Sequence, residues 1–210
     1  DFGIFGGRIN GNVDAYYRKT SDLLNNITTP MGNNFSNTVI SNVGNMKNMG
    51  VEFNLNFIPI EKQDMRWTIN VNGTYQKTEI TKLTNDDSTY LGVQTGANMG
   101  GTGGYTSLHR VGYAPYTYYL YQQAYDENGK AIQNVLVDRD GDGSITEADR
   151  YVTGKSITPK FFFGLSSQFT YKKWDFGFNA HGSFGGYALN RIAMNNSSAF
   201  SDDYTKGYIN

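Results

Sequence analysis

Hydrophobic and polar residues alternate along five segments of the chain. In the segment 66–76, for example, Trp67 and Val71 belong to an apolar set of positions, whereas Asn70 and Asn72 belong to a polar set. Because successive side chains of a β-strand point to opposite faces, this alternation predicts strands with one apolar and one polar face. The predicted strands lie near residues 7–19, 48–58, 66–76, 160–171 and 174–185.

The length of these segments favours a membrane protein. Each alternation continues for about 9–11 residues, the length that a tilted strand needs to cross a bilayer. Strands of soluble proteins more often contain about 5–6 residues. A soluble β-sandwich or a secreted β-solenoid would alternate in the same way, so both folds remain as alternatives. The pattern therefore predicts an all-β fold and favours part of a large antiparallel transmembrane β-barrel.

The connections between the predicted strands are of two kinds. Two are short, Pro59–Arg66 and Lys172–Lys173, and the rest are long. Outer-membrane barrels have short periplasmic turns and long extracellular loops. We therefore assign the short links to the periplasm and expect outer-membrane lipid around the strands. The expected extracellular loops are 20–47, 77–159 and 186–210.

The composition agrees with this interpretation. The chain has 210 residues with 38% apolar residues, yet 15% are aromatic, including 16 Tyr and 13 Phe, and 25 are Gly. Gly disfavours helices, whereas Tyr and Phe favour strands. The net charge of −1 gives no reason to expect nucleic acid as a partner. There is no cysteine, which excludes disulfides and thiolate metal sites.

Five strands are too few to close a barrel, since about eight are needed and large plugged transporters use about 22. An open strand edge in lipid would leave backbone hydrogen-bonding groups without partners. We therefore expect this stretch to be completed by further strands.

One motif carries recognisable chemistry, the twelve-residue acidic loop from Asp138 to Asp149. Its oxygen-bearing residues recur at positions 1, 3, 5, 7, 9 and 12, and Gly143 stands at position 6, where a calcium loop turns sharply. Asp149 replaces the usual Glu at the last position. The spacing predicts one Ca²⁺ in an isolated EF-hand-like loop. The predicted ligands are Asp138, Asp140, Asp142, the Ser144 carbonyl, Thr146 directly or through water, and Asp149.

Catalytic motifs are not evident, and the chain is not expected to be an enzyme. His109 and His181 lie on different predicted elements, and no Gly-x-Ser-x-Gly motif occurs. A glycan-active enzyme that uses the Asp cluster as acid and base is a weaker hypothesis, because calcium binding explains the same carboxylates. A secreted, calcium-stabilised binding or adhesion module is the main alternative function.

Several stretches resemble, in order, motifs of the SusC/RagA-type TonB-dependent transporters. These are 16–24, 43–52, the acidic loop with 158–164 beyond it, and 174–190. Trp174 stands where that family usually has Phe, and Asp140 where Asn is common.

This resemblance implies an outer-membrane barrel of Bacteroidetes with an N-terminal plug. Such transporters import glycans or peptides with energy passed on by TonB, under the cap of a SusD-like surface lipoprotein. The chain is similar to a late portion of the barrel, so the plug and the segment that contacts TonB are expected outside it.

Overall fold

The structure is a computed structural model that describes residues 1–28, 38–83, 91–98 and 104–190. The chain divides into two compact units. The sheet unit comprises Asp1–Val93, His109–Pro115 and Thr158–Gly186. The insert unit comprises Gln94–Leu108, Tyr116–Ile157 and the chain from Tyr187 onward. No helix among the described residues is long and apolar enough to span a membrane.

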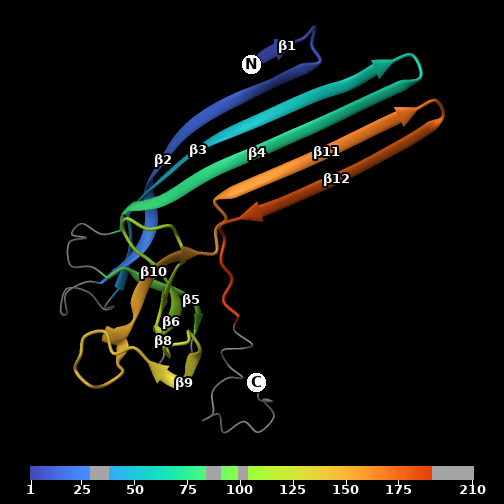
Figure 1. The fold of residues 1–210 in the computed structure, drawn as a ribbon. Helices are drawn as coiled ribbons and strands as arrows, with labels where there is room; N and C mark the ends of the chain where they lie inside the picture. Colours follow the sequence, from blue (N-terminus) through green and yellow to red (C-terminus); the bar gives the residue numbers. More distant parts are fainter. Residues whose placement is uncertain (29–37, 84–90, 99–103, 191–210) are drawn as a thin grey trace. The chain divides into compact units, whose positions relative to one another are not determined.

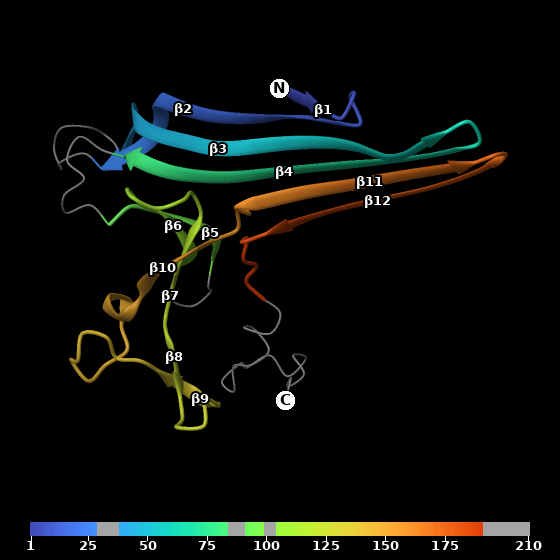
Figure 2. The ribbon, with the colours of Figure 1, turned by 45° about the horizontal axis from the view of Figure 1, so that its top comes forward.

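The sheet unit is built on one antiparallel sheet of six strands (Figure 1). Its strand order is β1-β2-β3-β4-β11-β12, so β4 and β11 pair directly although the insert unit separates them in sequence. The long strands lie side by side in a single layer (Figure 2). The strands are β1 (Phe2–Ile4), β2 (Ile9–Thr28), β3 (Thr38–Lys62), β4 (Met65–Lys82), β11 (Phe161–Tyr171) and β12 (Trp174–Phe184).

The register places the apolar positions of neighbouring strands opposite one another. Val71 of β4 pairs with Leu55 of β3 on one side and with Leu165 of β11 on the other. Leu165 in turn pairs with Ala180 of β12. Because paired residues of an antiparallel ladder share a face, the apolar sets merge into one surface across the sheet.

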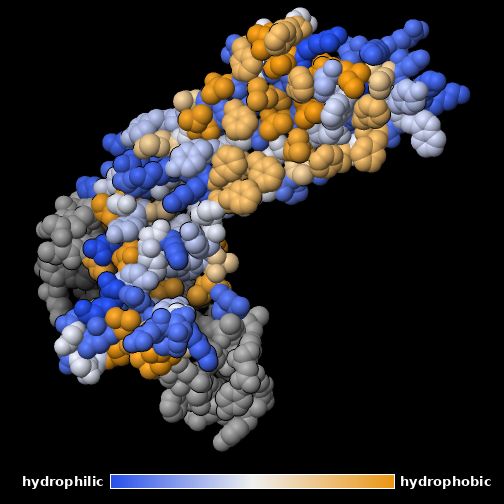
Figure 3. Space-filling view, viewed as in Figure 1, coloured by the Kyte–Doolittle hydropathy of each residue, from blue (hydrophilic) through white to orange (hydrophobic). Residues whose placement is uncertain are grey.

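This apolar face is exposed in the chain by itself. Trp174 and Phe176 of β12 are 79% and 69% exposed, and Val13 of β2 is 60% exposed. Figure 3 shows hydrophobic residues gathered over the sheet. A contiguous apolar surface of this kind needs a cover of lipid or protein.

The opposite face of the sheet is polar. Asn54 pairs with Asn72, and Asn56 with Asn70, which donates a 3.2 Å hydrogen bond from Nδ2 to Asn54 Oδ1. Ser166 of β11 lies beside Asn70 in the same row. The sheet therefore separates an apolar face from a face of amides and hydroxyls, as the alternation predicts.

Strands β11 and β12 coincide with the predicted segments 160–171 and 174–185, but three other strands are longer than predicted. The expected loop 20–47 is wrong in part, because β2 continues to Thr28 and β3 begins at Thr38. Bulges between Thr20 and Leu24 shift the register there. The bulges end the regular alternation, so the sequence pattern stops before the ladder does.

The expected loop 77–159 also contains more structure than predicted. Strand β4 continues to Lys82, and the insert unit forms a four-stranded sheet, β10-β7-β6-β5, and a β8–β9 hairpin. The bounds are β5 (Val93–Asn98), β6 (Tyr105–His109), β7 (Thr117–Leu120), β8 (Gln123–Tyr125), β9 (Ala131–Leu136), the 3-10 helix η1 (Glu147–Asp149) and β10 (Tyr151–Ser156). Of the expected loop 186–210, residues 191–210 lie outside the described residues.

We predict opposite tolerance at two adjacent positions of β4. In the full-length protein, Val71→Arg should destabilise the membrane-inserted barrel by about 2–4 kcal/mol, because an Arg on the lipid face near the midplane must leave water. Asn72→Arg, the matched control on the polar face, should cost much less. Urea titration of the refolded protein in lipid vesicles measures both free energies of unfolding, and equal losses would contradict the assignment of the faces.

Candidate functional site

The acidic loop joins β9 to β10 in the insert unit and brings three carboxylates together. Oxygen atoms of Asp138, Asp140 and Asp149 lie within 4.8 Å of one another. Asp138 and Asp140 enter from the start of the loop, whereas Asp149 comes from η1 at its end. The loop thus folds back so that residues eleven positions apart meet at one point.

Backbone geometry explains how the chain curls around Asp138. Gly141 and Gly143 both have positive φ angles, +76° and +84°, which residues with a side chain rarely adopt. Their amides point inward, so that Gly141 N donates to Asp138 Oδ1 at 2.6 Å and Gly143 N to Asp138 Oδ2 at 2.8 Å. The two glycines therefore permit the turn, and the Asp138 carboxylate stabilises it by accepting both hydrogen bonds.

The end of the loop is fixed by a capping box around η1. Thr146 is the N-cap residue, and its hydroxyl accepts a hydrogen bond from Ala148 N at 3.2 Å. The fully buried Asp149 carboxylate accepts from Thr146 N at 2.7 Å and from Arg139 N at 2.6 Å. Asp149 thereby ties the two ends of the loop together.

The carboxylates differ in their electrostatic surroundings. Backbone hydrogen bonds, first from Thr146 and then from Arg139, lower the pKa of Asp149 and outweigh its desolvation. At Asp140 a hydrogen bond from the Asp142 amide also favours ionisation. Desolvation, the negative charges of Asp142 and Asp149, and contact with Asp138 outweigh that bond and raise the pKa of Asp140. Mutual repulsion is therefore concentrated at Asp140.

The two neighbouring arginines direct their charges away from the cluster. Arg139 donates from Nη1 to Gln122 Oε1 at 2.6 Å, and its guanidinium lies 4.6 Å from the ring centre of Tyr151. The buried Arg150 guanidinium donates to backbone carbonyls within the insert unit. Among the described residues, no Lys or Arg forms an ion pair with the three clustered carboxylates. The negative charge of the cluster thus has no side-chain counterion there.

The structure brings together only part of the predicted ligand set. Asp138, Asp140 and Asp149 form the cluster, but Asp142 lies outside it, and Asp142 Oδ1 accepts from Ser144 N at 2.7 Å. The Thr146 hydroxyl caps η1. The complete six-residue set therefore stays a prediction.

The sequence pattern did not indicate the role of Arg150, which anchors the loop in the insert unit. Its guanidinium is buried and donates from Nη2 to the backbone carbonyls of Tyr119, at 2.7 Å, and Tyr105. It also lies 4.1 Å from the ring centre of Tyr119. An arginine one residue after an acidic loop has no distinctive sequence signal. The tyrosine-rich run 113–121 is the only hint of a partner.

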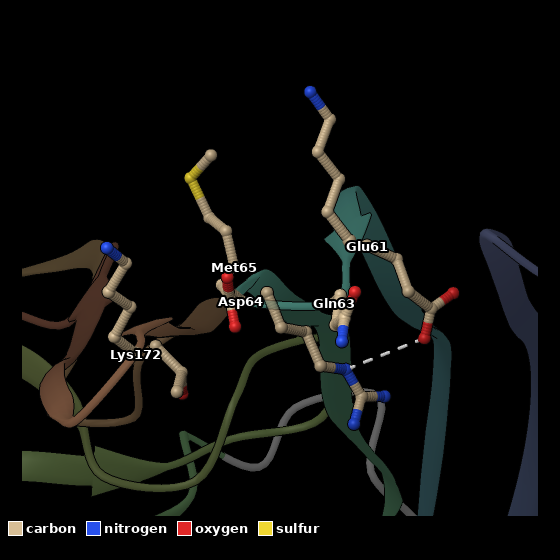
Figure 4. Close-up of a pocket in the computed structure, with 8 residues that line it drawn as sticks. Glu61, Gln63, Asp64, Met65 and Lys172 are labelled. Carbon is tan, nitrogen blue, oxygen red and sulfur yellow. Dashed lines mark ion pairs between the residues drawn. The ribbon is translucent and has the colours of Figure 1, made fainter.

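The end of the sheet that carries the short turns forms a second candidate region (Figure 4). Lys172 N donates to the Asp64 carbonyl at 2.8 Å, which joins the β11–β12 turn to the β3–β4 turn. Arg66 Nε lies 3.8 Å from Glu61 Oε1, and both side chains are exposed. Such an exposed ion pair contributes little stability. The residues that line the pocket between these turns do not form a cluster suited to catalysis.

Curated proteins similar to this chain are TonB-dependent receptors. The chain is 40% identical over 209 residues to TonB-dependent receptor SusC of Bacteroides thetaiotaomicron, covering 97% of this chain and 21% of that protein. It is 29% identical over 220 residues to TonB-dependent receptor P39 of Formosa agariphila, covering 88% of this chain and 21% of P39. The chain thus spans about one fifth of the length of these relatives. No family model matches the chain.

Solved structures show the same fold. The structure of the RagAB peptide transporter superposes with a TM-score of 0.66 at 24% identity, over 92% of this chain and 21% of that chain. The RagAB peptide importer in its 'open-open' state gives a TM-score of 0.66 at 23% identity, over 88% of this chain and 19% of that chain.

Proposed function

Because the chain belongs to the SusC/RagA type of TonB-dependent receptors, which are outer-membrane β-barrel proteins, we propose that it forms part of a transport barrel. Its strands would form a section of the wall, and the insert unit would form an extracellular loop. The receptor would import oligomeric nutrients, glycans or peptides, into the periplasm. TonB would supply the energy through regions outside this chain, and a SusD-like surface lipoprotein would cap the barrel.

The two-faced, single-layer sheet is the observation that carries this proposal. The exposed apolar residues on one face suit lipid, and the amides and hydroxyls on the other suit a water-filled lumen. A secreted binding module would have to cover the apolar face with a second layer. The described strands of the sheet unit form a single layer (Figure 2).

The topology supports an extracellular insert unit. Strand β4 leads into the insert and β11 leads back, and Gln76 N donates to Lys160 O at 2.8 Å where they meet. The turns β1–β2, β3–β4 and β11–β12 all lie at the other end of the ladder. Short turns of outer-membrane barrels face the periplasm. The insert unit would therefore emerge on the outside.

Labelling of intact cells tests this orientation. In the full-length receptor, Asn128→Cys in the β8–β9 turn should react with a membrane-impermeant maleimide, whereas Lys173→Cys should react only after the outer membrane is opened. Both variants should be recovered in the outer-membrane fraction. Labelling of Lys173→Cys alone in intact cells would reverse the orientation, and recovery in the medium would favour the secreted module.

We also propose that the acidic loop binds one Ca²⁺. Asp138, Asp140 and Asp149 supply the hard oxygen ligands that Ca²⁺ prefers, and their mutual repulsion has no side-chain counterion in the described structure. Asp142, Ser144 and Thr146 would complete the set after a local rearrangement. The ion would link the start of the loop, at Asp138 and Asp140, to its end at Asp149. Asp149 directly precedes the buried Arg150, which anchors the end of the loop in the insert unit.

Protease protection tests the calcium proposal. Calcium at millimolar concentration should slow tryptic cleavage within the insert unit of the full-length receptor, and EGTA should reverse this effect. Asp140→Ala should abolish the calcium dependence and leave heat-resistant assembly of the barrel unchanged. Glu127→Gln, which removes an exposed acid of the β8–β9 turn outside the acidic loop, serves as the control. Identical cleavage with and without calcium in the unmodified receptor would contradict the proposal.

A further inference from the structure

A group of charged residues ends the apolar face of the sheet on the side away from the short turns. We define the lysine cluster as Lys19 of β2, Lys47 of β3, and Lys77 and Glu79 of β4. Lys47 is the cross-strand partner of both Lys19 and Glu79, so these three side chains share one row. Lys77 stands on the same face of β4, two residues before Glu79.

The Glu79 carboxylate forms ion pairs with two of the three lysine ammonium groups. Lys47 Nζ lies 2.9 Å from Glu79 Oε1, and Lys77 Nζ lies 3.2 Å from Glu79 Oε2. Lys19 stands opposite Lys47, which lies between Lys19 and Glu79 in their shared row. Three lysines against one glutamate leave two positive charges in excess. Like charges directly opposite each other on neighbouring strands destabilise a sheet, and an anion placed over Lys19 and Lys47 would remove that cost.

The position of the cluster specifies the kind of anion. Toward the short turns, the row of Lys19, Lys47 and Glu79 is followed by the row of Tyr17, Met49 and Lys77, and then by the row of Ala15, Val51 and Tyr75. Tyr17 is 66% exposed, as suits an aromatic ring at a membrane interface. Lysines one or two rows above an apolar band can extend along it and place their ammonium groups at the level of the lipid headgroups.

We propose that the lysine cluster binds the phosphate monoester of an anionic lipid headgroup in the outer leaflet. This inference rests on the proposed barrel function, which places the apolar face in lipid and this rim outside. The phosphate would lie over Lys19 and Lys47, with Lys77 beside it and the acyl chains along the apolar face below. Glu79 would hold Lys47 and Lys77 upright and would limit the affinity.

Lipid binding to the full-length receptor in nanodiscs tests the proposal. Nanodiscs of phosphatidylcholine with added monophosphoryl lipid A provide the probe, and native mass spectrometry measures the bound lipid. The variant Lys19→Gln/Lys47→Gln/Lys77→Gln should bind the probe more weakly, by roughly fivefold for each lysine removed. The variant Glu79→Gln should bind it more strongly, because an opposing charge is lost.

A matched control and two further measurements make the result specific. The variant Lys62→Gln/Lys172→Gln/Lys173→Gln removes the same charge at the short turns and should bind the probe like the unmodified receptor. Dephosphorylated lipid A should bind weakly to all forms, and inorganic phosphate alone should not displace the probe. Unchanged binding after loss of the three lysines, equal binding of the dephosphorylated lipid, or displacement by inorganic phosphate would overturn the proposal. Failure of the unmodified receptor to form a heat-resistant barrel would instead contradict the proposed function.

Discussion

The register between β4 and β11 is the constraint on which the rest of the structure depends. Most of the insert unit lies between these strands in sequence, yet they pair without a break from Phe161↔Tyr75 to Tyr171↔Met65. A slip of one residue would move the side chains of Phe161, Phe163 and Leu165 from the apolar face to the polar face. The bond from Trp67 Nε1 to Ser167 Oγ, at 3.0 Å, reinforces this register and satisfies two polar groups on the apolar face.

The paired strands also determine where the insert unit can act. Because β4 and β11 are neighbours, the largest segment of the insert unit, Tyr116–Ile157, lies in sequence between two adjacent strands of the sheet. Within the insert, Arg150 anchors the end of the acidic loop to the backbone of β6 and β7. A bound cation would therefore act on the folding of a loop and not on the wall.

The alternation of apolar and polar residues predicted the strands wherever one face of a strand is apolar and the other is polar. It located β11 and β12 to within a residue, and it assigned Val71 and Asn72 to the correct faces. It failed beyond Thr20 and before Asn48, where bulges interrupt the period. The spacing of the Asp and Gly residues likewise identified the acidic loop, because these residues shape the turn through local backbone angles and hydrogen bonds. The anchoring of Arg150 depends on contacts distant in sequence, and a single sequence carries no signal for these.

In the proposed barrel, the apolar face of the sheet lies in lipid. Single nitroxide labels at each position of β11, in the full-length receptor reconstituted in lipid nanodiscs, test it most directly. We expect accessibility to oxygen and to a water-soluble nickel reagent to alternate along β11 with a period of two. Phe163 and Leu165 should favour oxygen, whereas Gly164 and Ser166 should favour nickel. Accessibility to the nickel reagent at every position, without alternation, would contradict it.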